Sequence, residues 1–315
     1  MKRLLSIVFT TIATVWAAPS LAIHDLDPAK LHLLSANAVI VDAANGRQLF
    51  GKAANEVTPI ASLTKLMTAM VVLDAKLPLE ELLDVDMEDF DFLKGSGSRL
   101  RMGATLSRDE MLRLALMASE NRAASALARH YPGGNSAFIA AMNVKARGLG
   151  MKRTRFEDST GLSPRNVSTA SDLAQMVQAA ATYPLIREYS TTMAHHVSVD
   201  PSGRTLGYNN SNALVRNGAW DIQLQKTGYI REAGRCVVLL ATIASRPMVI
   251  VLLDSIGKYT RLTDAQRVKH WLETGETMPV AAKPLIVRVA GKTTAKRVNG
   301  TFPPKIASSS KTRGG

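Results

Sequence analysis

The chain has 315 residues, of which 46% are hydrophobic and 21% are charged, and its formal net charge is +13. This composition excludes an intrinsically disordered protein and provides enough apolar residues for one large domain or two lobes. The single cysteine, Cys236, excludes an intramolecular disulfide, and its apolar neighbours predict a buried strand position.

The first 22 residues have the pattern of a secretory signal peptide. Lys2 and Arg3 form a basic start, an apolar run covers residues 4–18, and Ser20-Leu21-Ala22 is a small-x-small cleavage site. We therefore expect cleavage after residue 22, export, and a periplasmic mature protein.

The positive charge is concentrated near the C-terminal end of the sequence. From Lys283 onward there are eight basic residues and no acidic one. Without these eight and the two basic residues of the leader, residues 23–282 carry only +3, so the body does not indicate a nucleic-acid partner. We expect one folded domain over 23–275 and a basic, flexible tail over 276–315. An alternative role for this tail is attraction to an anionic polymer or a membrane surface.

The N-terminal part of the expected domain predicts a β-hairpin and then a helix. Strands over 36–41 and 48–52 flank an Asn45-Gly46 turn. A loop then leads to a helix on which Ser62 and Lys65 lie one turn apart. A serine beside a lysine amine of lowered pKa is a candidate nucleophile, although Ser-x-x-Lys is also compatible with an ordinary helix start.

The middle of the chain predicts a mostly helical block. Irregular short helices are expected over 77–94 and a loop over 95–98. Longer helices are expected from the capping box at 107–110, from 121 to 130, over 135–147, and from Thr169-x-x-Asp172 to about residue 182.

The last third predicts strands over 222–226, 235–244 and 247–254, followed by a helix over 259–273. Arg246-Pro247 interrupts the apolar stretch, so it predicts two strands and a turn in place of a membrane span. Strands at both ends of the chain imply one sheet, with the helical block as a second lobe and Ser62 at the junction. The six histidines show no metal-ligand spacing, so we expect no metal and no cofactor.

Three polar motifs occur in order on this map. They are Ser62-x-x-Lys65 at the start of a helix, Ser119-x-Asn121 between helices, and Lys226-Thr227-Gly228 at the end of a strand. With the supporting stretches at 38–42, 160–174 and 233–234, the chain resembles the low-molecular-mass penicillin-binding proteins of the D-alanyl-D-alanine peptidase family. The resemblance covers about residues 36–273.

The resemblance implies a mixed α/β fold of the DD-peptidase/β-lactamase type, with an antiparallel sheet flanked by helices and a mostly helical second lobe. Ser-Glu-Asn as the middle motif, and too few residues after Glu273 for a further β-domain, are similar to the endopeptidases of the family. The implied activity is cleavage of D-alanyl–meso-diaminopimelyl cross-links in peptidoglycan. The alternatives are a DD-carboxypeptidase and, more distantly, a non-catalytic wall-binding protein.

The resemblance also implies roles for the motif residues. Ser62 would be the acylated nucleophile and Lys65 its general base. Ser119 would relay a proton to the leaving amine, and Asn121 would hold Lys65 and the substrate amide. The substrates are peptidoglycan stem peptides, and β-lactam antibiotics would be covalent inhibitors.

The strand motif is implied to bind the substrate. Lys226 and Thr227 would bind its carboxylate, and Gly228 would let its backbone lie along the strand. The oxyanion hole would combine the N–H groups of Ser62 and Tyr229. Arg231 and Arg235 are secondary candidates for carboxylate contact.

Two features depart from related patterns. Residues 163–166, Ser-Pro-Arg-Asn, contain no acid, so the deacylating Glu-x-x-x-Asn loop of class A β-lactamases is missing and slow β-lactam turnover is expected. The middle motif carries Glu120 where Asp or Gly is commoner, and the sequence gives no physical reason for it.

Overall fold

The computed structural model describes residues 26–199 and 203–278. The signal peptide expected over 1–22, and nearly all of the tail expected over 276–315, lie outside these residues. The described residues all belong to one compact unit. None of the helices in the described ranges is long and apolar enough to cross a membrane.

A five-stranded antiparallel sheet joins the two ends of the described chain, as the sequence predicted. Its strand order is β2-β1-β11-β10-β9. The strands are β1 (Asn37–Asp42), β2 (Arg47–Lys52), β9 (Asp221–Ile230), β10 (Gly234–Ile243) and β11 (Arg246–Ser255). β1 is buried along its whole length because it lies between β2 and β11. β9 is an edge strand, and this leaves one of its sides free to face the rest of the molecule.

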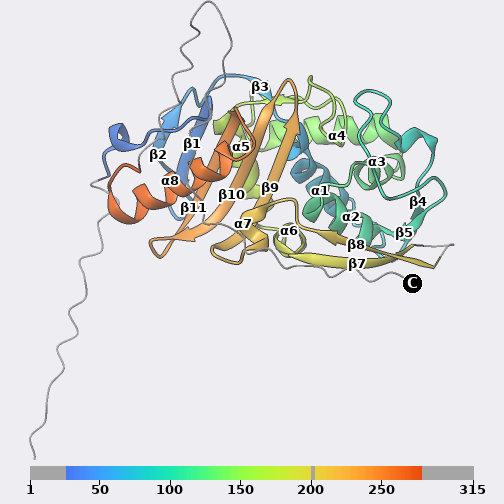
Figure 1. The fold of residues 1–315 in the computed structure, drawn as a ribbon. Coiled ribbons are helices and arrows are strands. Elements are labelled where there is room, and N and C mark those ends of the chain that lie inside the picture. The colour runs from blue at the N-terminus through green and yellow to red at the C-terminus, as the bar shows by residue number, and fades with distance from the viewer. Residues whose placement is uncertain (1–25, 200–202, 279–315) are drawn as a thin grey trace, which may run out of the picture. The chain divides into compact units, whose positions relative to one another are not determined.

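Helices cover both faces of this sheet (Figure 1). Helix α8 (Thr260–Thr274) packs on one face through Val268, Trp271 and Leu272. Helix α5 (Ala170–Ala180) lies against β1, β10 and β11 on the other face. The β10 side chains alternate between these two cores, as a strand buried on both faces requires: Val237 belongs to the α8 core and Val238 to the opposite one.

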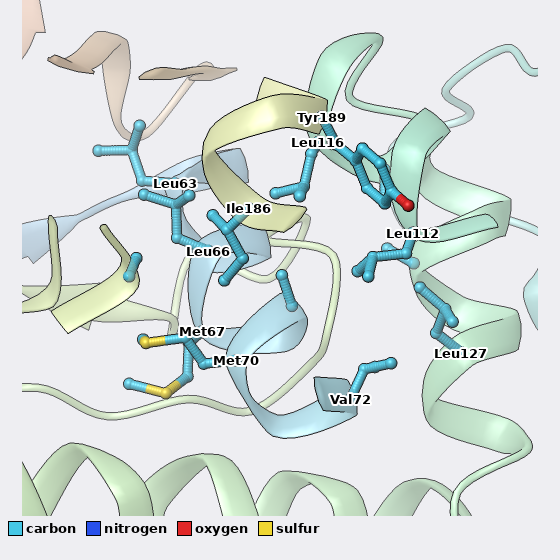
Figure 2. Close-up of a cluster of buried hydrophobic side chains, with 14 of the residues drawn as sticks. Leu63, Leu66, Met67, Met70, Val72, Leu112, Leu116, Leu127, Ile186 and Tyr189 are labelled. Atoms are coloured by element: carbon cyan, nitrogen blue, oxygen red, sulfur yellow. The ribbon is translucent and has the colours of Figure 1, made fainter. Parts of the chain in front are cut away.

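The remaining helices form a block centred on α1 (Thr64–Asp74). They are α2 (Arg108–Met117), α3 (Asn121–Arg129), α4 (Gly134–Gly148) and α6 (Pro184–Thr191). Figure 2 shows α1 contributing Leu66, Met67 and Met70 to a buried cluster that also contains Leu112 of α2 and Ile186 of α6. Nine of the eleven α1 residues are buried, which fixes the helix rigidly beneath the residues that precede it.

Several predicted elements differ from the structure. Residues 77–94 contain a short strand, β4 (Leu82–Asp84), which pairs with β5 (Thr105–Ser107), and a 3₁₀ turn, Met87–Asp89. Hairpin β7–β8 (Ala194–Val199 and Arg204–Asn209) was not predicted, although buried and exposed residues alternate along β8 and the second half of β7. Strand β9 continues to Ile230, so Lys226-Thr227-Gly228 lies inside the strand and does not end it. Cys236 is fully buried on β10, as expected, and burial raises the pKa of its thiol to about 12.

Candidate functional site

A cavity of about 690 Å³ lies between the edge strand β9 and the helical block. Its wall contains Ser62, Ser119, Asn121, Thr227, Gly228 and Tyr229. All three sequence motifs therefore meet at one site. At one rim, Lys94 Nζ lies 2.5 Å from Glu232 Oε1 and joins the loop before α2 to the β9–β10 turn.

Ser62 sits in a 3₁₀ turn, Ala61–Leu63, immediately before α1 starts at Thr64. The predicted helix thus begins two residues after the serine. Two glycines make room for this turn: a Cβ on Gly228 would lie 3.0 Å from the Ser62 nitrogen, and a Cβ on Gly161 would lie 2.0 Å from the Ala61 oxygen. Gly228 was expected to leave room for the substrate backbone along the strand. In the structure, its lack of a side chain leaves room for the backbone of the turn that contains Ser62.

Replacing Gly161 by alanine is expected to lower the free energy of unfolding by about 3 kcal/mol, because the new Cβ overlaps backbone and the residue has φ = +84°. The matched control is Gly103→Ala, since Gly103 has φ = +74° but no atom near the added Cβ. Urea unfolding of both variants measures the difference. Equal losses would show that the close approach to Ala61 is unimportant.

Lys65 is fully buried beneath Ser62. Its Nζ lies 3.0 Å from Ser62 Oγ, 2.7 Å from Asn121 Oδ1 and 2.6 Å from the Thr160 carbonyl oxygen. The last two oxygens can only accept hydrogen bonds. A neutral amine has two N–H groups for these acceptors and one lone pair left for the Ser62 hydroxyl proton, so the geometry suits a general base.

Burial makes this neutral form more accessible than it is for a lysine in water. Burial lowers the pKa of Lys65 to about 8, while the nearby carboxylates of Asp158 and Glu120 act to raise it. Lys226 is also fully buried, and burial together with Lys65 and Arg261 holds its pKa well below the ordinary value. Burial thus shifts the titration of two amines in one site toward lower pH.

The rate of acylation is expected to rise about tenfold from pH 7 to pH 9, because the neutral fraction of an amine with pKa about 8 rises from about one tenth to about nine tenths. In the folded protein the pKa of Lys65 is about 8, below the ordinary 10.5. Between these two pH values the unfolded chain therefore binds more protons than the folded chain. The free energy of unfolding should therefore rise with pH across that window. Stopped-flow acylation measures the first effect and urea unfolding the second. A rate that does not change across this range would contradict the base role.

Ser119 and Asn121 reach the site from the junction of α2 and α3. Ser119 has φ = +62°, a conformation that non-glycine residues seldom adopt, and it lines the cavity. Asn121 accepts from Lys65, while its amide nitrogen donates to Ser96 Oγ at 2.9 Å. The loop containing Ser96 was predicted, but its contact with the middle motif was not.

Glu120, between Ser119 and Asn121, is buried. It is the N-cap residue of α3, where its carboxylate accepts a hydrogen bond from the Arg122 N–H at 3.3 Å. An acid there stabilises the helix that begins with Asn121. This is the physical reason for Glu120 that the sequence alone did not give.

Within residues 26–199 and 203–278, no group of three or more His, Cys, Asp and Glu side chains could hold a metal ion.

The structure separates the two polar residues of the strand motif. Thr227 lines the cavity, and its hydroxyl lies 2.8 Å from Ser211 Oγ. Lys226 lies beneath the wall, where its Nζ donates to the Thr227 carbonyl oxygen at 3.0 Å. Direct carboxylate contact was expected of both residues, but only Thr227 is on the cavity surface.

Arg261 is a cavity residue that the sequence reasoning missed. It lies in the first turn of α8, and its Nη1 donates to the Gly228 carbonyl oxygen at 3.2 Å. Its buried Nε has no hydrogen-bond partner among the described residues. Arg231 and Arg235 also line the cavity, so three guanidinium groups face one end of it. The predicted closing helix gave no signal for this role, which depends on where α8 meets β9.

A second missed feature is the loop that supports Lys65 from behind. Asp158 accepts hydrogen bonds from the backbone N–H groups of Thr160 at 2.7 Å, Gly161 at 2.5 Å and Ser163 at 2.7 Å. These bonds fix the Thr160 carbonyl that contacts Lys65. Asn166 ends the segment 163–166, which contains no acidic residue. Its side chain is fully buried and donates to Thr64 Oγ1, so its role is structural.

Several known proteins are similar to this chain in sequence and in fold. The family described as D-alanyl-D-alanine carboxypeptidase matches residues 25–257. The chain is 49% identical to D-alanyl-D-alanine endopeptidases of Pseudomonas aeruginosa, over 81% of this chain and 83% of that one, and of Escherichia coli, over 80% and 82%. The crystal structure of the Streptomyces K15 DD-transpeptidase is similar with a TM-score of 0.72 at 26% identity, covering 77% of this chain and 98% of that one.

Proposed function

The chain belongs to the D-alanyl-D-alanine carboxypeptidase family of peptidases, and we propose that it is a serine DD-peptidase that cleaves D-alanyl–meso-diaminopimelyl cross-links of peptidoglycan. The observation that carries this proposal is the buried Lys65 amine, 3.0 Å from Ser62 Oγ at the wall of the cavity. Relatives at 49% identity that are named endopeptidases support the choice of cross-links as substrate.

In the first step, Ser62 Oγ attacks the carbonyl carbon of the D-alanyl residue of the cross-link while its proton passes to the neutral amine of Lys65. The carbonyl oxygen becomes an oxyanion, which the N–H groups of Ser62 and Tyr229 stabilise. Both donors belong to rigid elements, the 3₁₀ turn wedged between Gly161 and Gly228 and the strand β9. Little rearrangement is needed as the charge develops.

Collapse of the tetrahedral intermediate breaks the C–N bond and gives the acyl-enzyme. The leaving amine takes a proton through Ser119, and the proton is supplied by the ammonium of Lys65. Asn121 keeps Lys65 in place during both transfers through its 2.7 Å contact. Water then hydrolyses the ester and regenerates Ser62.

The carboxylate of the leaving residue binds at the arginine-rich end of the cavity. Thr227 and Arg261 are the groups placed to hold it, because both line the cavity next to Gly228. Lys226 acts through Thr227, whose carbonyl it contacts. Benzylpenicillin carries an equivalent carboxylate and acylates Ser62 by the same route. Since residues 163–166 supply no acid, hydrolysis of the penicilloyl-enzyme is slow.

Digestion of purified cross-linked sacculi tests the proposal against the carboxypeptidase alternative, which uses the same catalytic residues. The endopeptidase converts dimeric muropeptides to monomers. Persisting dimers, with pentapeptide monomers trimmed to tetrapeptides, would assign the chain to the carboxypeptidases.

The site also bears on the non-catalytic alternative. A wall-binding protein needs no fully buried lysine amine 3.0 Å from a serine hydroxyl at a cavity wall. We therefore favour the enzyme.

Export by the leader 1–22 into the periplasm is part of the proposal, because its pattern is that of a signal peptide. The basic tail is proposed to contact anionic wall or membrane surfaces. Truncation after residue 277 is expected to leave penicillin acylation unchanged and to weaken retention on sacculi at low salt, where charge attraction is least screened. A sedimentation assay measures retention, and lost acylation would instead place the tail in the fold.

A further inference from the structure

A second cavity, of about 380 Å³, adjoins the active-site cavity at the end of the sheet. The two cavities share Tyr229, Arg231 and Arg235 as lining residues. The rest of the second wall comes from Gly234, from Asp254 and Ser255 at the end of β11, and from residues 256–258 between β11 and α8. The two cavities therefore lie next to each other at the end of β9, with these three side chains between them.

The strand register places the second cavity on the face of the sheet where the leaving group's carboxylate is proposed to bind. Tyr229 lies opposite Arg235, and Thr227 lies opposite Val237. Directly opposed residues of an antiparallel pair project to the same face, and Val237 packs under α8. Thr227, Tyr229 and Arg235 thus share the α8 face, from which Arg261 also reaches the site.

The chemistry of the second cavity suits an anionic, partly apolar peptide. Its lining has three basic side chains, Arg231, Arg235 and Lys258, against one acidic side chain, Asp254. Two of its lining residues are large, hydrophobic and exposed: Tyr229 is 56% exposed and Ile256 is 77% exposed. Arg235 lies 4.6 Å from the centre of the Tyr229 ring. Exposed apolar surface beside positive charge is typical of a binding site for carboxylate-bearing groups.

We propose that this second cavity is the subsite for the leaving stem peptide of a cross-link, an inference that rests on the proposed function. When a cross-link is cut, the leaving group is a whole stem peptide with several carboxylates, which must continue beyond the Thr227–Arg261 contact. A carboxypeptidase substrate releases a single D-alanine that ends at that contact. The subsite therefore adds binding energy to cross-linked substrates alone.

The test compares two reagents on the full-length protein. A purified muropeptide dimer has a leaving stem, whereas benzylpenicillin has none. Lys258→Glu replaces attraction with repulsion, so we expect kcat/KM for the dimer to fall about fivefold, with a smaller loss at high salt. Ile256→Ser should also lower it. The penicillin acylation rate should be unchanged in both variants.

Lys152→Glu is the matched control, because it makes the same change of charge at an exposed position between α4 and β6. It should leave both rates unchanged. Undiminished dimer cleavage in Lys258→Glu and Ile256→Ser, or equal losses on dimer and penicillin, would overturn the subsite. A wild-type protein that is acylated by penicillin but leaves dimers intact would contradict the proposed endopeptidase function itself.

Discussion

Replacing Ser62 by alanine is expected to lower dimer cleavage by about six orders of magnitude, as loss of the nucleophile does in other serine peptidases. Labelling by fluorescent penicillin should disappear with it, because no oxygen remains to form the ester. The fold should survive, since Ser62 lies at the cavity wall and the change removes one hydroxyl. Gel fluorescence and muropeptide chromatography give the two readouts.

Ser119→Ala is the control for this variant, because it removes a hydroxyl from the same cavity while leaving the nucleophile. It should slow the reaction but still form a stable penicilloyl adduct. Retained label on Ser62→Ala would show that another residue is acylated and that the assignment of the nucleophile is wrong.

Replacing Lys65 by methionine is expected to slow acylation by about 10³-fold, within the range that a positioned general base contributes. Methionine has nearly the same length and suits a fully buried position. The change leaves Asn121 Oδ1 and the Thr160 carbonyl without their shared donor. Thermal unfolding must therefore accompany the stopped-flow measurement.

Lys65→Arg separates charge from proton transfer. It retains a cation, but its guanidinium cannot be deprotonated in proteins, so acylation should stay slow and should not rise from pH 7 to pH 9. An arginine variant with near wild-type rates would show that Lys65 serves as a fixed charge and not as the base.

Local signals in the sequence predicted much of the fold. The Asn-Gly turn defines the β1–β2 hairpin, and hydroxyl caps define helix starts: Ser107 Oγ accepts from the Glu110 N–H, and Thr169 Oγ1 accepts from the Asp172 N–H. The sheet built from both chain ends followed from strand runs at each end. These features depend on neighbouring residues, so a single sequence is enough to find them.

The missed features depend on contacts between distant segments. Arg261 enters the cavity only because α8 begins beside β9, and Asp158 matters only because its loop lies behind Lys65. The burial of Lys226 beneath Thr227 is likewise a result of how β9 packs on the helical block. The three motifs predicted which residues meet, but packing decides which of them face the substrate.

Mapping the acylated residue tests the central claim most directly. The wild-type protein is incubated with benzylpenicillin and digested with trypsin, and the modified peptide is sequenced by mass spectrometry. The adduct is predicted on Ser62, in the peptide that ends at Lys65. An adduct on Ser119, on Ser96 or on any other residue would contradict the account.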